Sequence, residues 1–132
     1  MSSIAIVYGT FHQKYVTEML EVVRHAAAEK KVNIVAEVGV PGSYEKPIAV
    51  KRLFLNDKID AVVVLGIIEK GETKHGLVMA ETVTKALLDL ELEFMKPLGM
   101  GILGPEIEPQ HIASRVKPYA LAAFDAALKM LE

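Results

Sequence analysis

Residues 61–67 read Ala-Val-Val-Val-Leu-Gly-Ile and form the most hydrophobic segment of the chain. A short, continuous apolar run rich in β-branched residues is typical of a strand buried on both faces, as in a parallel sheet covered by helices. A long helical pattern follows from about Lys74 to Phe94 and stops before Pro97. A fully buried strand followed by a long crossover helix indicates an α/β fold.

The rest of the chain repeats this alternation of strand and helix. Short apolar runs predict three more strands, and apolar positions at helical spacing predict three more helices. The expected strands are Ile4–Tyr8, Val32–Val38 and Leu98–Leu103, and the expected helices are about Gln13–Lys30, Lys46–Leu55 and Pro109–Leu131. Pro118 is placed to kink or split the last helix.

Such alternation favours right-handed crossovers and a parallel sheet with helices on both faces. No internal repeat, linker or low-complexity segment interrupts it. We therefore expect residues 1–132 to form one doubly wound α/β domain. Its four-stranded parallel sheet should be flanked by helices on both faces, in a flavodoxin-like three-layer arrangement.

The composition argues against several classes of protein. The net charge is −2 and no basic run occurs, which argues against nucleic acid as a partner. The chain has no cysteine, and therefore no disulfide, thiolate nucleophile or zinc–sulfur site. No apolar stretch is long enough to span a membrane and no secretion signal is recognisable, so we expect a cytoplasmic protein. An apolar share of 52% is slightly rich for 132 residues and indicates a homo-oligomer.

In doubly wound sheets, ligands bind beyond the carboxyl ends of the strands. Four predicted loops lie there, namely Gly9–His12, Val40–Glu45, Ile68–His75 and Gly104–Gln110. They hold most of the glycine, the proline and the unusual polar residues of the chain. We therefore expect the functional site at this edge of the sheet.

The segment Gly71-Glu72-Thr73-Lys74-His75 joins the most hydrophobic strand to the longest helix. Glycine lets the backbone approach a ligand, and the first amides of a helix are unpaired donors that suit a phosphate. A simpler interpretation makes Thr73 an ordinary helix cap and Gly71 an ordinary turn residue. The glycine and lysine spacing of a P-loop is absent.

Histidine can take and give protons near neutral pH. Of the four histidines, only His12 and His75 lie in loops where the site is expected; His25 and His111 belong to predicted helices. Glu72 and His75 have a spacing that some metal centres use on helices. Since no companion pair occurs elsewhere, we expect no metal.

Three further residues have two interpretations each. Phe11 either stacks on a planar ring or plugs the core. Glu45 either accepts hydrogen bonds from a polyol or is an exposed carboxylate near a helix start. Arg115 either binds an anion or lies on a solvated helix face.

Four segments, in this order and at these separations, resemble the lumazine synthase family. They are Phe11-His12, Val40-Pro41-Gly42-Ser43-Tyr44-Glu45-Lys46-Pro47, Leu65-Gly66-Ile67-Ile68-Glu69-Lys70-Gly71-Glu72-Thr73-Lys74-His75 and Gln110-His111-Ile112-Ala113-Ser114-Arg115. The Val-Pro-Gly-(small)-(aromatic)-Glu and Gly-Glu-Thr-x-His pieces are specific as a pair. The resemblance spans nearly the whole chain.

The resemblance implies condensation of 5-amino-6-ribitylaminouracil with 3,4-dihydroxy-2-butanone 4-phosphate in riboflavin biosynthesis, without cofactor or metal. His75 would carry protons. The residues implied to bind the pyrimidine substrate are Phe11, His12, Ser43, Tyr44, Glu45, Ile68, Glu69 and Met100. Those implied to bind phosphate are Gly71, Glu72, Thr73 and Arg115. The family builds pentamers, some packed into shells, and its sites lie between subunits, with Met100 and Arg115 supplied by the neighbour.

The chain departs from the family pattern at three places. His12 stands where asparagine is common, Met100 stands where an aromatic residue is frequent, and the basic residue usual after Arg115 has no clear match. We assign no role to Lys117.

Three other protein classes share part of this pattern. An archaeal-type riboflavin synthase shares the Val-Pro-Gly turn but lacks the Gly-Glu-Thr-x-His segment. A ligand-binding or shell-forming relative without turnover remains an alternative. A receiver domain would need acidic residues where Tyr8-Gly9 and Gly66-Ile67 stand.

Overall fold

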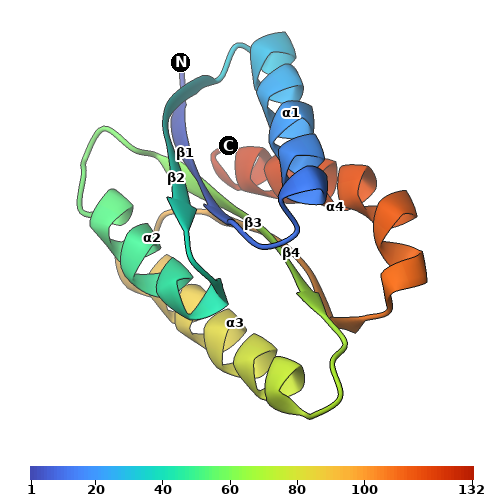
Figure 1. Cartoon of the computed structure of the whole chain (residues 1–132). Helices are drawn as coiled ribbons and strands as arrows, with labels where there is room; N and C mark the ends of the chain where they lie inside the picture. Colours follow the sequence, from blue (N-terminus) through green and yellow to red (C-terminus); the bar gives the residue numbers. More distant parts are fainter.

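Four parallel strands form one sheet in the order β2-β1-β3-β4 (Figure 1). The structure is a computed structural model that describes residues 1–132. The strands are β1 (Ser3–Gly9), β2 (Asn33–Val40), β3 (Ala61–Glu69) and β4 (Leu98–Ile107). This order and the parallel pairing confirm the expected doubly wound fold class.

Helices cover both faces of the sheet. Helices α1 (Gln13–Lys30) and α4 (Pro109–Met130) pack on one face, and α2 (Lys46–Phe54) and α3 (His75–Phe94) pack on the other (Figure 1). A single 3-10 turn, η1 (Ser43–Glu45), leads directly into α2. None of these helices combines the length and apolar character that a bilayer crossing requires.

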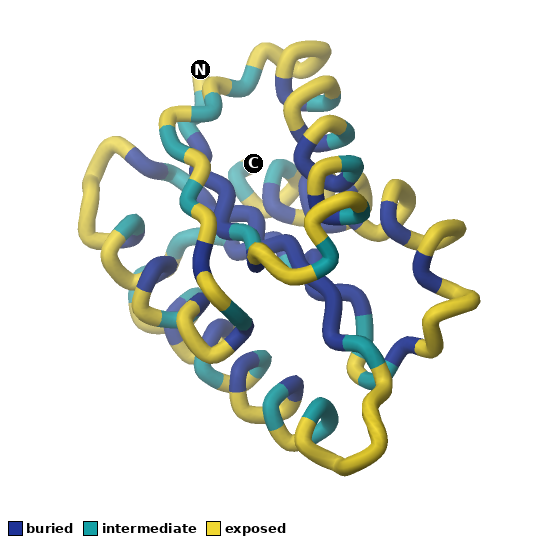
Figure 2. Tube along the Cα trace, viewed as in Figure 1, coloured by how far each residue is buried: buried dark blue, intermediate teal, exposed yellow.

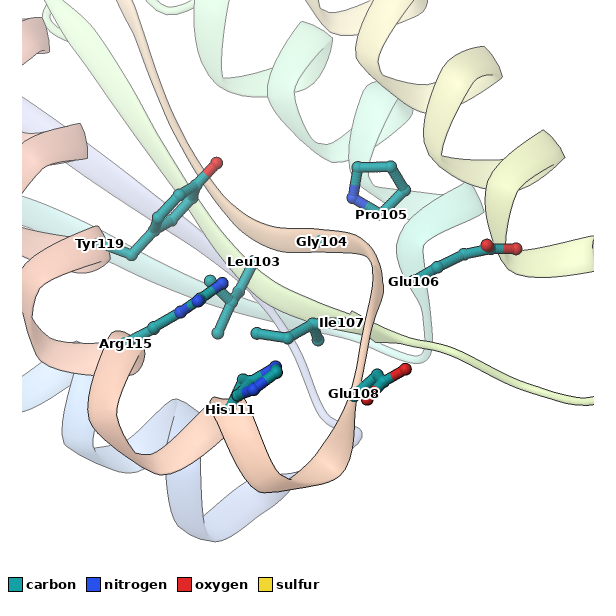
Figure 3. A pocket seen from close by; sticks show the side chains of 9 residues that line it. All are labelled: Leu103, Gly104, Pro105, Glu106, Ile107, Glu108, His111, Arg115 and Tyr119. Carbon is teal, nitrogen blue, oxygen red and sulfur yellow. The ribbon is translucent and has the colours of Figure 1, made fainter.

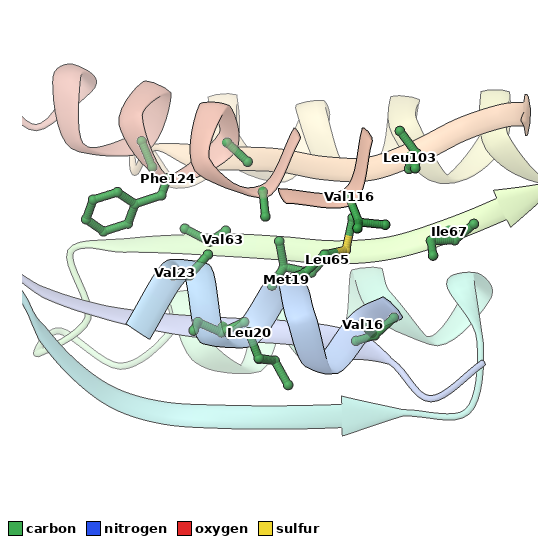
Figure 4. Packing of buried hydrophobic residues seen from close by; sticks show 14 of the residues in the cluster. Val16, Met19, Leu20, Val23, Val63, Leu65, Ile67, Leu103, Val116 and Phe124 are labelled. Atoms are coloured by element: carbon green, nitrogen blue, oxygen red, sulfur yellow. The ribbon is translucent and has the colours of Figure 1, made fainter. Parts of the chain in front are cut away.

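Strand β3 is buried along its length because both helical layers press on it. Alternate side chains of a strand point to opposite faces. Thus Val63, Leu65 and Ile67 join the core under α1 and α4 (Figure 4), whereas Val62 and Val64 join the core under α2 and α3. Strand β2 lies at the sheet edge and alternates between exposed and half-buried residues. The burial pattern in Figure 2 follows this layering, with the buried trace along the central strands.

The end of β4 differs from the prediction. The expected strand stopped at Leu103 and placed Gly104 in a loop, but β4 continues to Ile107. Beyond a register shift, Glu69 pairs with Ile107, and the Lys70 N–H donates to the Ile107 carbonyl at 2.9 Å. Pro105 is compatible with this extension because β4 is an edge strand, where a missing N–H costs no ladder hydrogen bond.

Other strand and helix ends differ from the predicted ones by one or two residues. The second strand begins and ends later than expected, α2 ends one residue earlier, and α3 begins at His75 rather than Lys74. Helix α4 runs unbroken through Pro118, so a split at this proline is wrong. The ring removes one backbone donor, and buried Val116 and Ala120 on either side of it keep the helix packed on the sheet.

Gly99→Ala should destabilise the fold by about 1–3 kcal/mol, because a methyl group there would overpack the contact between β4 and α4. A Cβ at residue 99 would lie 2.2 Å from the backbone oxygen of Ala123. The matched control is Gly71→Ala, where no atom lies within 4 Å of the added carbon. Urea denaturation of both variants measures the effect. Equal stability of the two variants would contradict this account of the packing.

Candidate functional site

A cleft of about 380 Å³ opens beyond the carboxyl ends of β1 and β3. We call it the β3 cleft. Its lining residues are Phe11, His12, Gly42, Ser43, Ile67, Ile68, Glu69, Gly71, Thr73, His75, Gly76 and Met79. Three of the four segments expected to bind a ligand therefore meet here, as the topology of a doubly wound sheet predicts.

The turn after β1 places an aromatic ring at the mouth of this cleft. His12 adopts a left-handed backbone conformation with φ of 55° and precedes the first residue of α1. Its Nε2 atom lies 3.5 Å from the Glu69 carboxylate of β3. Phe11, on the same turn, is 70% exposed. Phe11 is therefore not buried in the hydrophobic core, so that interpretation is wrong, and its ring is available to a ligand.

The start of α3 forms the opposite side of the β3 cleft. Thr73 Oγ1 accepts a hydrogen bond of 3.2 Å from the backbone N–H of His75, so Thr73 does organise the helix start. Its hydroxyl hydrogen is still available to a ligand oxygen, because the bond to His75 uses a lone pair. The N-cap position itself belongs to Lys74, so Thr73 is not the helix cap, but its bond to His75 is compatible with a ligand contact. The His75 ring meets the Tyr44 ring edge-on, with 6.1 Å between centroids.

Five residues implied by the family resemblance do not line the β3 cleft, namely Tyr44, Glu45, Glu72, Met100 and Arg115. Tyr44 contacts the ring of His75, which lines the cleft, but is not itself a lining residue. Met100 packs against the core under α2 and α3. No group of three or more His, Cys, Asp or Glu side chains is arranged to hold a metal ion.

Arg115 faces a second depression, which we call the α4 pocket. It has a volume of about 320 Å³ and is lined by Leu103, Gly104, Pro105, Glu106, Ile107, Glu108, His111, Arg115 and Tyr119 (Figure 3). Arg115 and His111 are four residues apart on α4 and both extend toward β4 (Figure 3). Arg115 forms no ion pair within the chain. Its guanidinium is therefore free to receive an anion.

The β3 cleft and the α4 pocket share no lining residue. Within one chain, Arg115 and the Gly71–His75 segment, which the resemblance places together, therefore line different depressions. The family model described as 6,7-dimethyl-8-ribityllumazine synthase matches residues 2–132.

The chain belongs to the 6,7-dimethyl-8-ribityllumazine synthase family. Curated relatives with that name include one from Metallosphaera sedula, 39% identical over 127 residues, covering 96% of this chain and 84% of the relative. Another, from Saccharolobus solfataricus, is 35% identical over 129 residues, covering 98% and 84%. A third, from Sulfolobus acidocaldarius, is 34% identical over 130 residues, covering 98% and 82%.

One polar residue behind the cleft escaped sequence reasoning. Lys46, at the start of α2, is 1% exposed, and its Nζ donates to Ser43 Oγ at 3.2 Å. Burial lowers the pKa of this ammonium to about 8, because the charged form loses its hydration. The signal was present in the sequence: Lys46 precedes the apolar Ala49, Val50 and Phe54 at helical spacing, which places a lysine on a core face.

The lowered pKa of Lys46 predicts that the free energy of unfolding depends on pH. The folded-state pKa lies below the unfolded value of 10.5, so the unfolded state binds the proton more tightly. The stability of the native protein relative to Lys46→Met should therefore be lowest below pH 8. It should rise by up to about 3 kcal/mol as pH increases through 10.5, at about 1.4 kcal/mol for each pKa unit.

Chemical denaturation of the native protein and of Lys46→Met between pH 7 and 11 checks this. The methionine variant is expected to be the more stable at pH 7, because it buries no charge. Lys51→Met is the control, since Lys51 lies on the same helix but is exposed. A stability difference that does not change with pH would contradict the lowered pKa.

Proposed function

We propose that the protein is a lumazine synthase, a cytoplasmic transferase of riboflavin biosynthesis. It would condense 5-amino-6-ribitylaminouracil with 3,4-dihydroxy-2-butanone 4-phosphate, giving 6,7-dimethyl-8-ribityllumazine, phosphate and water. The observation that carries the proposal is the match of residues 2–132 to the family of that name. The β3 cleft supports it, because it brings an exposed ring, a histidine and a helix start to one place.

The pyrimidine substrate would occupy the β3 cleft. Phe11 would stack on the heterocycle, and Ile68 and Glu69 at the end of β3 would meet its edge, largely through backbone groups. His12 and Tyr44 border this space. Ser43 and Glu45, on η1, would hold the ribityl chain through hydrogen bonds.

The phosphate of the second substrate would bind at the start of α3. Gly71, Glu72 and Thr73 lead into this helix, whose first N–H groups and dipole favour an anion. The Arg115 guanidinium would add a bidentate contact that suits a phosphate. Met100, opposite Val64 within the sheet, would complete the site from β4 of the neighbouring subunit.

The reaction needs proton transfers but no redox step. The 5-amino group of the pyrimidine attacks the ketone carbon, and loss of one water gives an imine. Removal of a proton from the adjacent carbon, which bears a hydroxyl, lets the C–O bond to phosphate break and leaves an enol. The enol takes up a proton at its terminal carbon to become a methyl ketone, and the 6-ribitylamino nitrogen then attacks this ketone and closes the ring with loss of a second water. His75 would carry these protons. Holding two substrates together supplies much of the remaining rate enhancement. No cofactor is required.

We further propose that the active form is a homo-oligomer, a pentamer or a multiple of it, with each site between two subunits. The assigned residues fall into two depressions that share no lining residue. This supports the proposal, because the β3 cleft of one subunit would face the α4 pocket of its neighbour. Exposed apolar residues on α3, Val78, Leu88 and Leu92, provide surface for such contacts.

An absorbance assay tests the activity directly. The pyrimidine and the butanone phosphate are mixed with the protein, and the lumazine product and free phosphate are followed together. Matched appearance of both is expected. Pyrimidine binding without product would favour a non-catalytic relative, and formation of riboflavin from two lumazine molecules would favour an archaeal-type riboflavin synthase.

His75→Ala should lower kcat by roughly 100-fold or more, the usual contribution of a general acid–base group, with little change in pyrimidine affinity. Steady-state kinetics and calorimetric titration of the pyrimidine separate the two quantities. His25→Ala is the control, because His25 is exposed on α1 and pairs only with Glu29. An unchanged kcat in His75→Ala would show that His75 does not carry protons in the reaction.

Arg115→Ala should raise KM for the butanone phosphate roughly 10- to 100-fold, because a charge-assisted contact is lost, while pyrimidine affinity stays the same. Arg52→Ala, an exposed arginine on α2, serves as the control. An equal loss of affinity for both substrates would indicate structural damage.

Mixing the His75→Ala and Arg115→Ala chains tests whether the site is shared. If His75 and Arg115 of one site come from different subunits, random co-assembly restores about a quarter of the sites. If both residues come from one chain, every site keeps one defect, and no activity returns when the butanone phosphate is kept well below the raised KM. Recovery after co-refolding of equal amounts is the expected result.

A further inference from the structure

Lys46 is the only charged residue in the buried interior of the chain. No carboxylate oxygen lies within 4 Å of its Nζ, and the Ser43 hydroxyl is its one hydrogen-bond partner. An unpaired buried charge normally costs several kcal/mol, and an apolar side chain would avoid this cost. Stability alone therefore does not account for a lysine at this position.

Two glycines make room for the ammonium. A Cβ at Gly66 of β3 would lie 2.2 Å from Lys46 Nζ, and one at Gly9 of β1 would lie 3.4 Å from it. The Lys46 side chain therefore runs from α2 across the ends of the two central strands. Its charged end lies beside Gly9, the last residue of β1, and beside Gly66, which directly precedes the cleft-lining Ile67.

Ser43 connects the ammonium to the β3 cleft. It is itself buried, lines the cleft and receives the hydrogen bond from Lys46. A protonated lysine has donors and no acceptor. The Ser43 oxygen must therefore accept, and the Ser43 hydroxyl hydrogen, which is donated to no atom of the chain, is left for a ligand in the cleft.

We propose that Lys46 is a positioning residue that holds Ser43 as a hydrogen-bond donor to an oxygen acceptor of the pyrimidine substrate. This role rests on the proposed function, since it states which partner donates and which accepts in one hydrogen bond between the protein and that substrate. A neutral amine at the same place could accept the Ser43 hydrogen instead and would release this constraint. The affinity that Lys46 adds should therefore disappear as the ammonium loses its proton.

The effect of Lys46 on ligand affinity can be separated from the titration of its neighbours. The other titratable groups on the neighbouring parts of β1, the turn before α1, η1, β3 and α3 are Tyr8, His12, Tyr44, Glu45, Glu69 and His75. All of them are present in both the native protein and Lys46→Met. The ratio of the two dissociation constants therefore cancels their titration and that of the ligand.

The test measures the Kd of 5-amino-6-ribitylaminouracil alone, by calorimetry on the assembled full chain. At pH 7, Lys46→Met should bind roughly fivefold more weakly than the native protein, the value of one hydrogen bond. The ratio should approach one at pH 9.5, above the Lys46 pKa of about 8. Lys51→Met, on the exposed side of α2, should bind like the native protein at both pH values.

A double-mutant cycle identifies the route of the effect. In a Ser43→Ala background, Lys46→Met should change the Kd no further, because its only partner is gone. Equal affinity of native and Lys46→Met protein at pH 7, a ratio independent of pH, or an additive loss in the Ser43→Ala background would each overturn the proposal. If the native protein binds no pyrimidine at either pH, the proposed function itself is wrong.

Discussion

From Ala61 to Ile68, strand β3 carries no polar side chain, because helices cover it on both faces and leave no access for water. Each buried valine or leucine there contributes about 1.5–3 kcal/mol relative to exposure. The remaining elements are arranged around this strand: β1 and β4 pair with its two edges, and the two helix pairs close its two faces. The polar chemistry is thereby displaced to the end of the strand, where Glu69 emerges and the Gly71–His75 segment begins.

One polar pair is buried in the otherwise apolar interior, at the boundary between core and cleft. Lys46 and Ser43 are the only polar residues in the buried set, and they are hydrogen-bonded to each other. Lys46 orients the Ser43 hydroxyl toward a ligand in the cleft without contacting the ligand itself. The pair lies in a region of low dielectric, where each hydrogen bond is stronger than in water. The cost in stability and the gain in ligand orientation thus arise from the same buried charge.

Most of the fold was predictable because it depends on local patterns. Periodicity located all four strands and four helices, and strand–helix alternation indicated the parallel sheet. The extension of β4 through Pro105 was not predictable, because the tolerance for proline depends on which strand lies at the edge. In the site, loop positions correctly grouped Phe11, Ser43 and His75. Arg115 lines a different depression from these three, which a pattern within one chain could not reveal. Lys46 was missed because helix-start lysines are usually solvated.

The close approach of Lys46 to Gly66 also restricts how the sequence can change over time. A side chain at residue 66 places its first carbon 2.2 Å from the Lys46 nitrogen, so the ammonium must leave Ser43 to admit it. The two positions are therefore epistatic: alanine at 66 is compatible with a short or apolar residue at 46 but not with the lysine in its present place. The hydrogen bond between Lys46 and Ser43 can therefore persist over time only while residue 66 is glycine.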